Sequence, residues 1–121
     1  MPAYEAGIFK PPAPVVRALV RGPTNLASDV PLLVDTGADV SLIPLKVASV
    51  VGAQRHPSSA PIQSLGGEEM SCLEADLTTE FLGYRFRGPF LITESDYGIL
   101  GRNILNLLFV TLDGPNLSWS A

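Results

Sequence analysis

The sequence predicts an all-β domain of short strands with one or two short helices. Of its 121 residues, 11 are proline and 11 are glycine, which favours closely spaced turns over long helices. Several short segments also alternate apolar and polar residues, as half-buried strands do. Short strands joined by frequent turns are typical of a barrel or a sandwich.

The first part of the chain predicts an arm followed by two strands. Residues 1–12 are rich in proline and predict an extended N-terminal arm, so we place the folded domain at residues 13–121. Residues 14–21 alternate and present an apolar face on every second position, which predicts a strand. The continuous apolar run at 30–34 predicts a strand buried on both faces. Asp35-Thr36-Gly37 ends that strand.

The rest of the chain predicts further short elements separated by Gly and Pro. We expect strands at 40–43, 70–77, 84–87 and 89–93, helical turns at 45–51 and 98–106, and a last hairpin between 107–112 and 116–119. Between the extended segments around residues 61–65 and 70–77, the pair Gly66-Gly67 predicts a hairpin tip.

Composition excludes several classes of protein. Apolar residues make up 46% and charged residues 17%, the opposite of the balance that disorder requires. A net charge of −4 with dispersed Lys and Arg argues against a nucleic-acid partner. No apolar run approaches the ~20 residues of a membrane span, and the N-terminus has no signal-peptide pattern. We therefore expect a cytoplasmic protein without a membrane span.

The metal-binding and thiol residues are few. Cys72 is the only cysteine and His56 the only histidine, so we expect no internal disulfide and no metal site. A Ser-His or Cys-His hydrolase would need His56, which lies in what the sequence predicts to be an exposed loop. Cys72 alternates with Met70 and is better explained as a small packing residue than as a nucleophile.

Asp35 is the main candidate for chemistry. A carboxylate directly after an apolar run is costly to bury unless nearby donors compensate, and Thr36 and Gly37 supply a hydroxyl and a bare backbone. Taken alone, such an aspartate is better explained as the cap of a turn. A strand-end aspartate is also the nucleophile of some phosphatases, but those need a second acid two residues later, where Gly37 stands.

Two motifs together change this interpretation. The first is residues 33–44, LVDTGADVSLIP, and the second is residues 97–105, YGILGRNIL. With these motifs the chain resembles the retroviral-type aspartic proteases, the retropepsins, and more closely their single-domain bacterial relatives. A lone Asp-Thr-Gly is a weak signal, whereas the two blocks in this order are a strong one. The resemblance implies a closed barrel of short strands with a flap hairpin, active as a two-fold homodimer.

The resemblance also implies roles for individual residues. Asp35 is then the catalytic aspartate, Thr36 locks the active-site loops of two subunits together, and Gly37 presents its backbone to a bound peptide. Asp39 and Arg102 are expected to form a structural ion pair beside the active-site floor. The substrate-binding positions are expected at Ala38, Val40, Leu65, Gly66, Gly67 and Ile99. Glu68 and Glu69, at the expected flap, make it more acidic than the family pattern leads us to expect.

The mechanism of this family needs two carboxylates that share one proton. Each of the other aspartates, namely Asp29, Asp39, Asp76, Asp96 and Asp113, lacks the Thr-Gly or Ser-Gly that would make a second motif. Asp35 must therefore meet Asp35 of a second copy across a two-fold axis. The apolar residues of the C-terminal tail, among them Leu107, Phe109 and Trp119, are candidates for that interface or for the monomer core.

The sequence therefore predicts a homodimeric aspartic endopeptidase. It hydrolyses peptide bonds with a water activated by two Asp35 carboxylates, binds its polypeptide substrate as an extended strand, and needs no cofactor. The alternative is a non-catalytic module of the same fold that serves in dimerisation or peptide binding, because a fold does not prove an activity.

Overall fold

The computed structural model describes residues 2–58, 62–63, 69–70 and 72–121. The elements in chain order are β1 (Tyr4–Glu5), β2 (Ala13–Arg21), β3 (Ala27–Val34), β4 (Leu42–Pro44), α1 (Leu45–Val50), β5 (His56–Pro57), β6 (Ile62–Gln63), β7 (Glu69–Met70), β8 (Leu73–Phe81), β9 (Tyr84–Thr93), β10 (Gly98–Leu100), α2 (Arg102–Leu105), β11 (Thr111–Asp113) and β12 (Ser118–Ser120).

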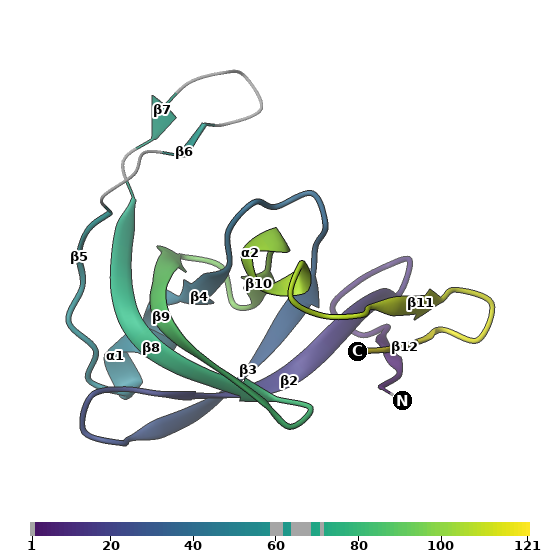
Figure 1. The fold of residues 1–121 in the computed structure, drawn as a ribbon, viewed down its shortest axis with the longest axis horizontal. Coiled ribbons are helices and arrows are strands. Elements are labelled where there is room, and N and C mark those ends of the chain that lie inside the picture. Colours follow the sequence, from purple (N-terminus) through teal and green to yellow (C-terminus); the bar gives the residue numbers. More distant parts are fainter. Residues whose placement is uncertain (1, 59–61, 64–68, 71) are drawn as a thin grey trace.

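The main sheet closes on itself to form a barrel (Figure 1). Its strands follow the order β2-β3-β10-β4-β9-β8, and a further pairing of β8 with β2 joins the two ends. Most neighbours are antiparallel, but β10 runs parallel to β3 and β4 runs parallel to β9. The prediction of an all-β closed barrel of short strands with one or two short helices is confirmed. None of the described helices is long and apolar enough to cross a membrane.

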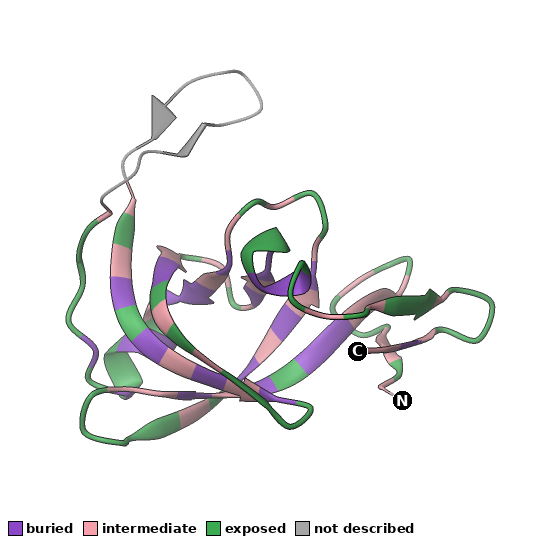
Figure 2. Cartoon of the chain, in the orientation of Figure 1, coloured by how far each residue is buried: buried purple, intermediate pink, exposed green. Residues whose placement is uncertain are grey.

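The core lies inside the barrel, where alternate residues of the long strands meet (Figure 2). In β2, the predicted face of Val16, Ala18 and Val20 is buried, while Arg17 is exposed. Because successive side chains of a strand point to opposite faces, one residue in two contributes to the core. The alternation expected for β2 is therefore present.

Several element bounds differ from the sequence prediction; for example, β8 extends to Phe81, and Tyr84–Thr93 form the single strand β9. Three further differences concern the path of the chain. First, β3 begins at Ala27 and is buried on one face only, since Pro31 and Leu33 are half-buried between fully buried neighbours. Second, the expected helix over 98–106 is the strand β10 followed by the one-turn helix α2, because Gly98 to Leu100 pair with β3. Third, the last hairpin begins at Thr111, since the chain still makes turn hydrogen bonds such as Leu108 N to Leu105 O.

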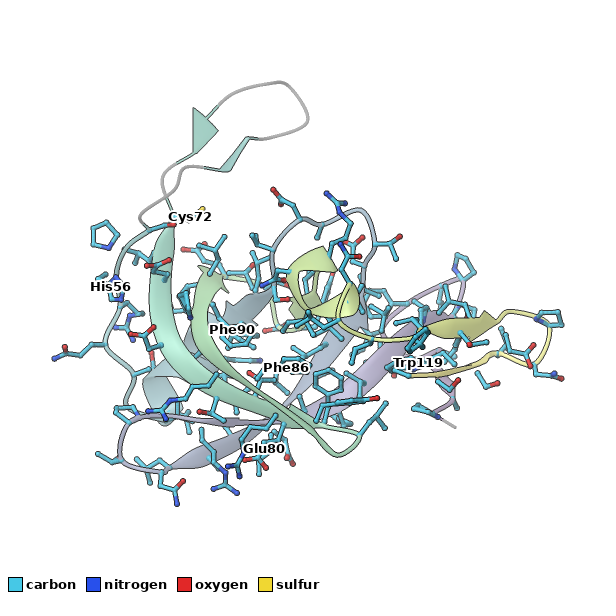
Figure 3. All side chains as sticks on the ribbon, viewed as in Figure 1. His56, Cys72, Glu80, Phe86, Phe90 and Trp119 are labelled. Atoms are coloured by element: carbon cyan, nitrogen blue, oxygen red, sulfur yellow. The ribbon has the colours of Figure 1, made fainter. Side chains whose placement is uncertain are left out.

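The two ends of the chain are paired with each other. The strand β1 pairs with the start of β2, and Ala3 forms an antiparallel bridge with Ser118 of β12. Trp119 is fully buried, and its ring nitrogen Nε1 donates a hydrogen bond to the carbonyl of Val15 at 3.3 Å (Figure 3). The expected N-terminal arm is thus attached to the C-terminal hairpin.

A second hairpin projects beyond the barrel from the ends of β5 and β8 (Figure 1). Its strands β6 and β7 pair antiparallel, with Ile62 opposite Met70 and Gln63 opposite Glu69. This is the region where the sequence predicts a flap. The expected tip residues Leu65, Gly66 and Gly67, as well as Glu68, lie outside the described residues.

Thr79 provides a test of the barrel core. Its side chain is fully buried, and its hydroxyl has no hydrogen-bond partner in the described part of the chain. An unpaired buried hydroxyl costs about 1–3 kcal/mol, so Thr79→Val, which keeps the shape, should raise the free energy of unfolding by about 1 kcal/mol or more. Urea unfolding measures this, with Thr78→Val, on the outer face of the same strand, as the control. A lower stability for Thr79→Val than for the wild type would contradict the expectation.

Candidate active site

Asp35 lies at the point where the two sequence motifs meet. It follows Val34, the last residue of β3, and β10 runs parallel alongside with Leu100 opposite Val34. The amide of Asp35 donates a hydrogen bond to the carbonyl of Leu100 at 3.1 Å. The parallel pairing therefore brings the Asp-Thr-Gly loop beside the turn at Gly101.

The carboxylate of Asp35 is held by its own loop. The amide of Gly37 donates a hydrogen bond to Oδ1 of Asp35 at 2.9 Å, and the amide of Ala38 donates to the carbonyl of Asp35 at 3.2 Å. These bonds fold the loop into a tight turn and orient one oxygen of the carboxylate. Asp35 is half-buried, whereas Thr36 and Gly37 are exposed. A carboxylate in a fixed orientation is thus presented at the surface of the single chain.

The helix α2 supports the loop from the other side. The amides of Arg102 and Asn103 donate hydrogen bonds to the carbonyls of Ala38 and Asp39 at 2.8 and 3.2 Å. The guanidinium of Arg102 reaches further and donates through Nη1 to the carbonyl of Thr36 at 2.7 Å. In these contacts the second motif holds the first in place through backbone carbonyls.

Gly101 allows this close approach. A Cβ at this position would collide with the backbone carbonyl of Val40 and approach the carbonyl oxygen of Ala38 to 3.1 Å. Backbone atoms cannot move aside as the end of a flexible side chain can, so only glycine fits here. The glycine of the second motif thus lets the chain pass directly over the loop of the first.

Ser41 links the two motifs, a role that sequence reasoning missed. This buried side chain accepts a hydrogen bond from the amide of Gly101 at 2.9 Å and donates to Oδ1 of Asn103 at 2.8 Å. Its own carbonyl accepts from the amide of Leu91 in β9. The signal available in the sequence is a small polar residue between apolar ones in the first motif, which predicts a buried hydroxyl that needs partners.

Asp39 and Arg102 are connected through the backbone in the single chain, and their side chains do not form the expected ion pair. Their side chains are not among the ion pairs within 4.0 Å that the described residues form, and Arg102 is engaged with the carbonyl of Thr36. Asp39 is exposed and joins α2 through its backbone carbonyl. The structural ion pair of these two residues stays a prediction.

The described residues of the expected substrate site lie in the Asp35 loop or in the strand beside it. Ala38 and Val40 lie in the loop after Asp35 and are half-buried, as is Ile99 in β10. Ile99 stands opposite Leu33 on one side and Leu42 on the other. These positions place partly accessible apolar side chains close to Asp35 in the chain and in the sheet.

His56 and Cys72 lie at the base of the projecting hairpin (Figure 3). His56 is exposed in β5, with Nδ1 at 3.6 Å from Oε1 of Glu74, and the carbonyl of Cys72 accepts a hydrogen bond from the amide of Ser58. None of the hydrogen bonds found among the described residues joins His56 or Cys72 to the loop of Asp35. In the described ranges, no group of three His, Cys, Asp or Glu residues could hold a metal ion.

Comparison with known proteins agrees with this geometry. The family model described as retroviral aspartyl protease matches residues 11–113, which include both motifs and every strand of the barrel. The chain belongs to the retroviral aspartyl protease family. A solved structure titled as EIAV protease complexed with the inhibitor HBY-793 is similar to this retropepsin in fold, with a TM-score of 0.61 at 22% sequence identity. The match covers 78% of this chain and 86% of that chain.

Ser41 can be tested in this retropepsin by removing its hydroxyl. Ser41→Ala leaves the buried amide of Gly101 without its acceptor, so we expect the free energy of unfolding to fall by about 1–3 kcal/mol. Thermal and urea unfolding measure the change. Ser28→Ala is the matched control, because the Ser28 hydroxyl reaches only the neighbouring Asp29 carbonyl, at 3.4 Å. Equal stability of the two variants would contradict the role assigned to Ser41.

Proposed function

We propose that this retropepsin is an aspartic endopeptidase whose active site is completed by two copies of Asp35, one from each subunit of a homodimer. Family membership supports aspartic protease activity in general. The observation that carries the finer proposal is the state of Asp35 in the single chain. Its carboxylate is oriented by Gly37, yet it lies at the surface in a loop whose Thr36 and Gly37 are exposed.

A single carboxylate cannot do the chemistry of this class. In an aspartic protease one carboxylate is ionised and takes a proton from the attacking water, while its protonated neighbour donates a hydrogen bond to the peptide carbonyl. That hydrogen bond stabilises the charge that develops on the carbonyl oxygen in the transition state. Because two like charges this close cannot both ionise, the proton belongs to the pair and the pair titrates as a unit.

The loop of Asp35 is suited to a two-fold axis. Its exposed Thr36 carries a hydroxyl for which the described residues provide no hydrogen-bond partner, and Arg102 already holds the Thr36 carbonyl. A hydrogen-bond acceptor of a second copy can therefore bind the Thr36 hydroxyl without breaking the bond between Arg102 and the Thr36 carbonyl. A closed dimer of this kind places the same residues of both chains at the axis.

The substrate of this site is a polypeptide bound as an extended strand. Ala38, Val40 and Ile99 offer partly accessible apolar side chains near Asp35, and we expect the hairpin of β6 and β7 to act as the flap over the peptide. An extended peptide gains affinity from backbone pairing and selectivity from pockets for alternate side chains. The alternative is a peptide-binding or dimerisation module without turnover. It differs from the protease only in that Asp35 does not activate water for cleavage.

Asp35→Asn separates these two functions. The amide keeps the shape of the side chain and can still accept the hydrogen bond from Gly37, but it cannot activate water, so cleavage should fall by at least about a hundredfold. Mass spectrometry of a mixed peptide library, incubated at acidic and at neutral pH, measures cleavage. The variant must first be shown to fold and associate like the wild type. A wild type that cleaves nothing beyond what Asp35→Asn cleaves would rule out the protease.

A mixing experiment tests whether the two carboxylates come from different chains. When equal amounts of wild type and Asp35→Asn exchange subunits at random, half of the wild-type chains enter mixed dimers with one carboxylate. Activity per wild-type chain should therefore fall to about half, because a lone carboxylate cannot share the proton. The control is the same mixture assayed before subunits exchange. Activity that is unchanged after full exchange would show that each chain carries a complete site.

A further inference from the structure

The first part of β9 has one edge that no strand covers. On one side, the strand pairs with β8 from Tyr84 to Leu91. On the other side it pairs with β4, but only from Leu91 to Thr93. For residues 84–90 the described part of the chain provides neither a strand nor a backbone hydrogen bond on that side. Most of β9 is therefore an open edge of the barrel.

The backbone groups that face this edge belong to Arg85, Arg87 and Pro89. The amide of Leu91 donates a hydrogen bond to the carbonyl of Ser41 at 3.2 Å, so the backbone groups of residue 91 point away from β8. Because backbone groups alternate in direction along a strand, those of residues 85, 87 and 89 point the same way. Proline has no N–H. The edge thus offers the amides and carbonyls of both arginines and the carbonyl of Pro89.

Beside this edge lies a groove with an apolar floor. It is a hollow of about 260 Å³ between β9 and the segment of α2, lined among others by Phe86, Phe90, Asn103, Ile104 and Leu107. Phe90 and Ile104 belong to the core, and Phe86 packs against it (Figure 3). Successive side chains of a strand point to opposite faces, so a strand added at the edge turns every second side chain into the groove. The groove fits apolar side chains at those positions.

The outer face of the same edge is basic. Arg85 and Arg87 are both exposed there. Glu80 forms ion pairs with Arg21 and Arg85, at 3.0 and 3.2 Å, and so serves two cations. Arg87 forms no ion pair within 4.0 Å with any described residue, Asp76 on the neighbouring strand included. One cation of the edge therefore lacks a counter-ion, and another shares its own.

The charge of the edge determines which partner fits. Two copies of the edge would bring their arginines together, and like charges opposite each other destabilise a sheet. Charged residues and proline also discourage pairing with a neutral strand. An acidic strand is different, because its carboxylates can accept charge-assisted hydrogen bonds from the guanidinium groups. The occupant that the edge selects is an extended acidic segment of another polypeptide.

We propose that the open edge of β9 binds a segment of a partner polypeptide in which acidic and apolar residues alternate. The segment joins the sheet as an added strand, and its backbone pairs with Arg85 and Arg87. Its acidic side chains contact the two guanidinium groups on the outer face, and its apolar side chains enter the groove. Strand addition gains affinity from backbone hydrogen bonds and selectivity from alternate side chains. This site is separate from the Asp35 loop and does not depend on the proposed protease activity.

The probe for this site is a short fluorescein-labelled peptide in which Glu and Val alternate. Its binding is measured by fluorescence anisotropy with the chain carrying Asp35→Asn, so that the peptide stays intact. The same peptide with Lys in place of Glu tests the charge. A version that is N-methylated at the residues whose amides would face β9 tests the backbone pairing. We expect both control peptides to bind at least about tenfold more weakly.

Two substitutions of Arg87 test the edge itself. Arg87→Gln removes the charge that lacks a counter-ion, and Arg87→Pro also removes the amide that faces the edge. Proline is tolerated where the N–H of an edge strand faces outward. We expect the dissociation constant of the probe to rise by at least about threefold for Arg87→Gln and about tenfold for Arg87→Pro. Arg55→Gln, at an exposed arginine outside β9, is the matched control and should change nothing. Circular dichroism checks the fold of each variant.

The position of the bound probe is measured separately, because the proposed active site also takes an extended peptide. In two-dimensional NMR of the isotope-labelled chain, we expect the probe to shift the amide signals of Arg85 and Arg87 and not those of Gly37 and Ala38. Shifts confined to the Asp35 loop overturn the site at β9, as does a probe that does not bind. A dissociation constant that neither Arg87 variant changes overturns it too.

These outcomes are distinct from a failure of the proposed function. Each result that overturns the site at β9 leaves the protease activity of the wild type as it was measured. A chain that binds the probe at β9, but whose wild type cleaves no peptide, supports the site and contradicts the proposed function.

Discussion

The hydrogen bond from the amide of Asp35 to the carbonyl of Leu100 joins the two parts of the molecule on which the site depends. It extends the parallel pairing of β3 with β10, which are neighbouring strands of the barrel. From this contact follow the approach of Gly101 to Val40 and the contacts of Arg102 with the loop carbonyls. The chemistry of Asp35 is thus prepared by a pairing between segments that are far apart in the chain.

The loop is held mainly by backbone groups. Amides of Gly37, Arg102 and Asn103 donate to oxygens of the loop, and a single buried side chain, Ser41, ties the second motif to the first. Buried backbone groups must find partners, so a loop that satisfies them in one arrangement has little freedom to adopt another. This explains how a short turn at a surface can hold a carboxylate in a fixed orientation, as proximity-based catalysis requires.

The described residues of the single chain leave the Asp35 loop and one edge of β11 uncovered. Thr36 and Gly37 of the Asp35 loop are exposed, and β11 has no second partner strand among the described residues. The two end segments, by contrast, are hydrogen-bonded to each other within the chain through Pro2, Tyr4 and Trp119. The chain thus builds its own hydrophobic core and pairs its own ends.

The sequence by itself determined the barrel class, the alternation of β2 and the position of Asp35, because these depend on local pattern and on two contiguous motifs. It did not reveal the role of Ser41, the single buried face of β3 or the engagement of Arg102 with the Thr36 carbonyl. Each of these depends on which segment lies opposite. Likewise, the sequence did not show which apolar residues of the C-terminal tail are buried. Only the fold shows that Trp119 fills the core and that Phe109 is exposed. The physical reason is that strand pairing decides which residues are neighbours across a closed sheet. The local pattern of apolar and polar residues does not specify which strands pair.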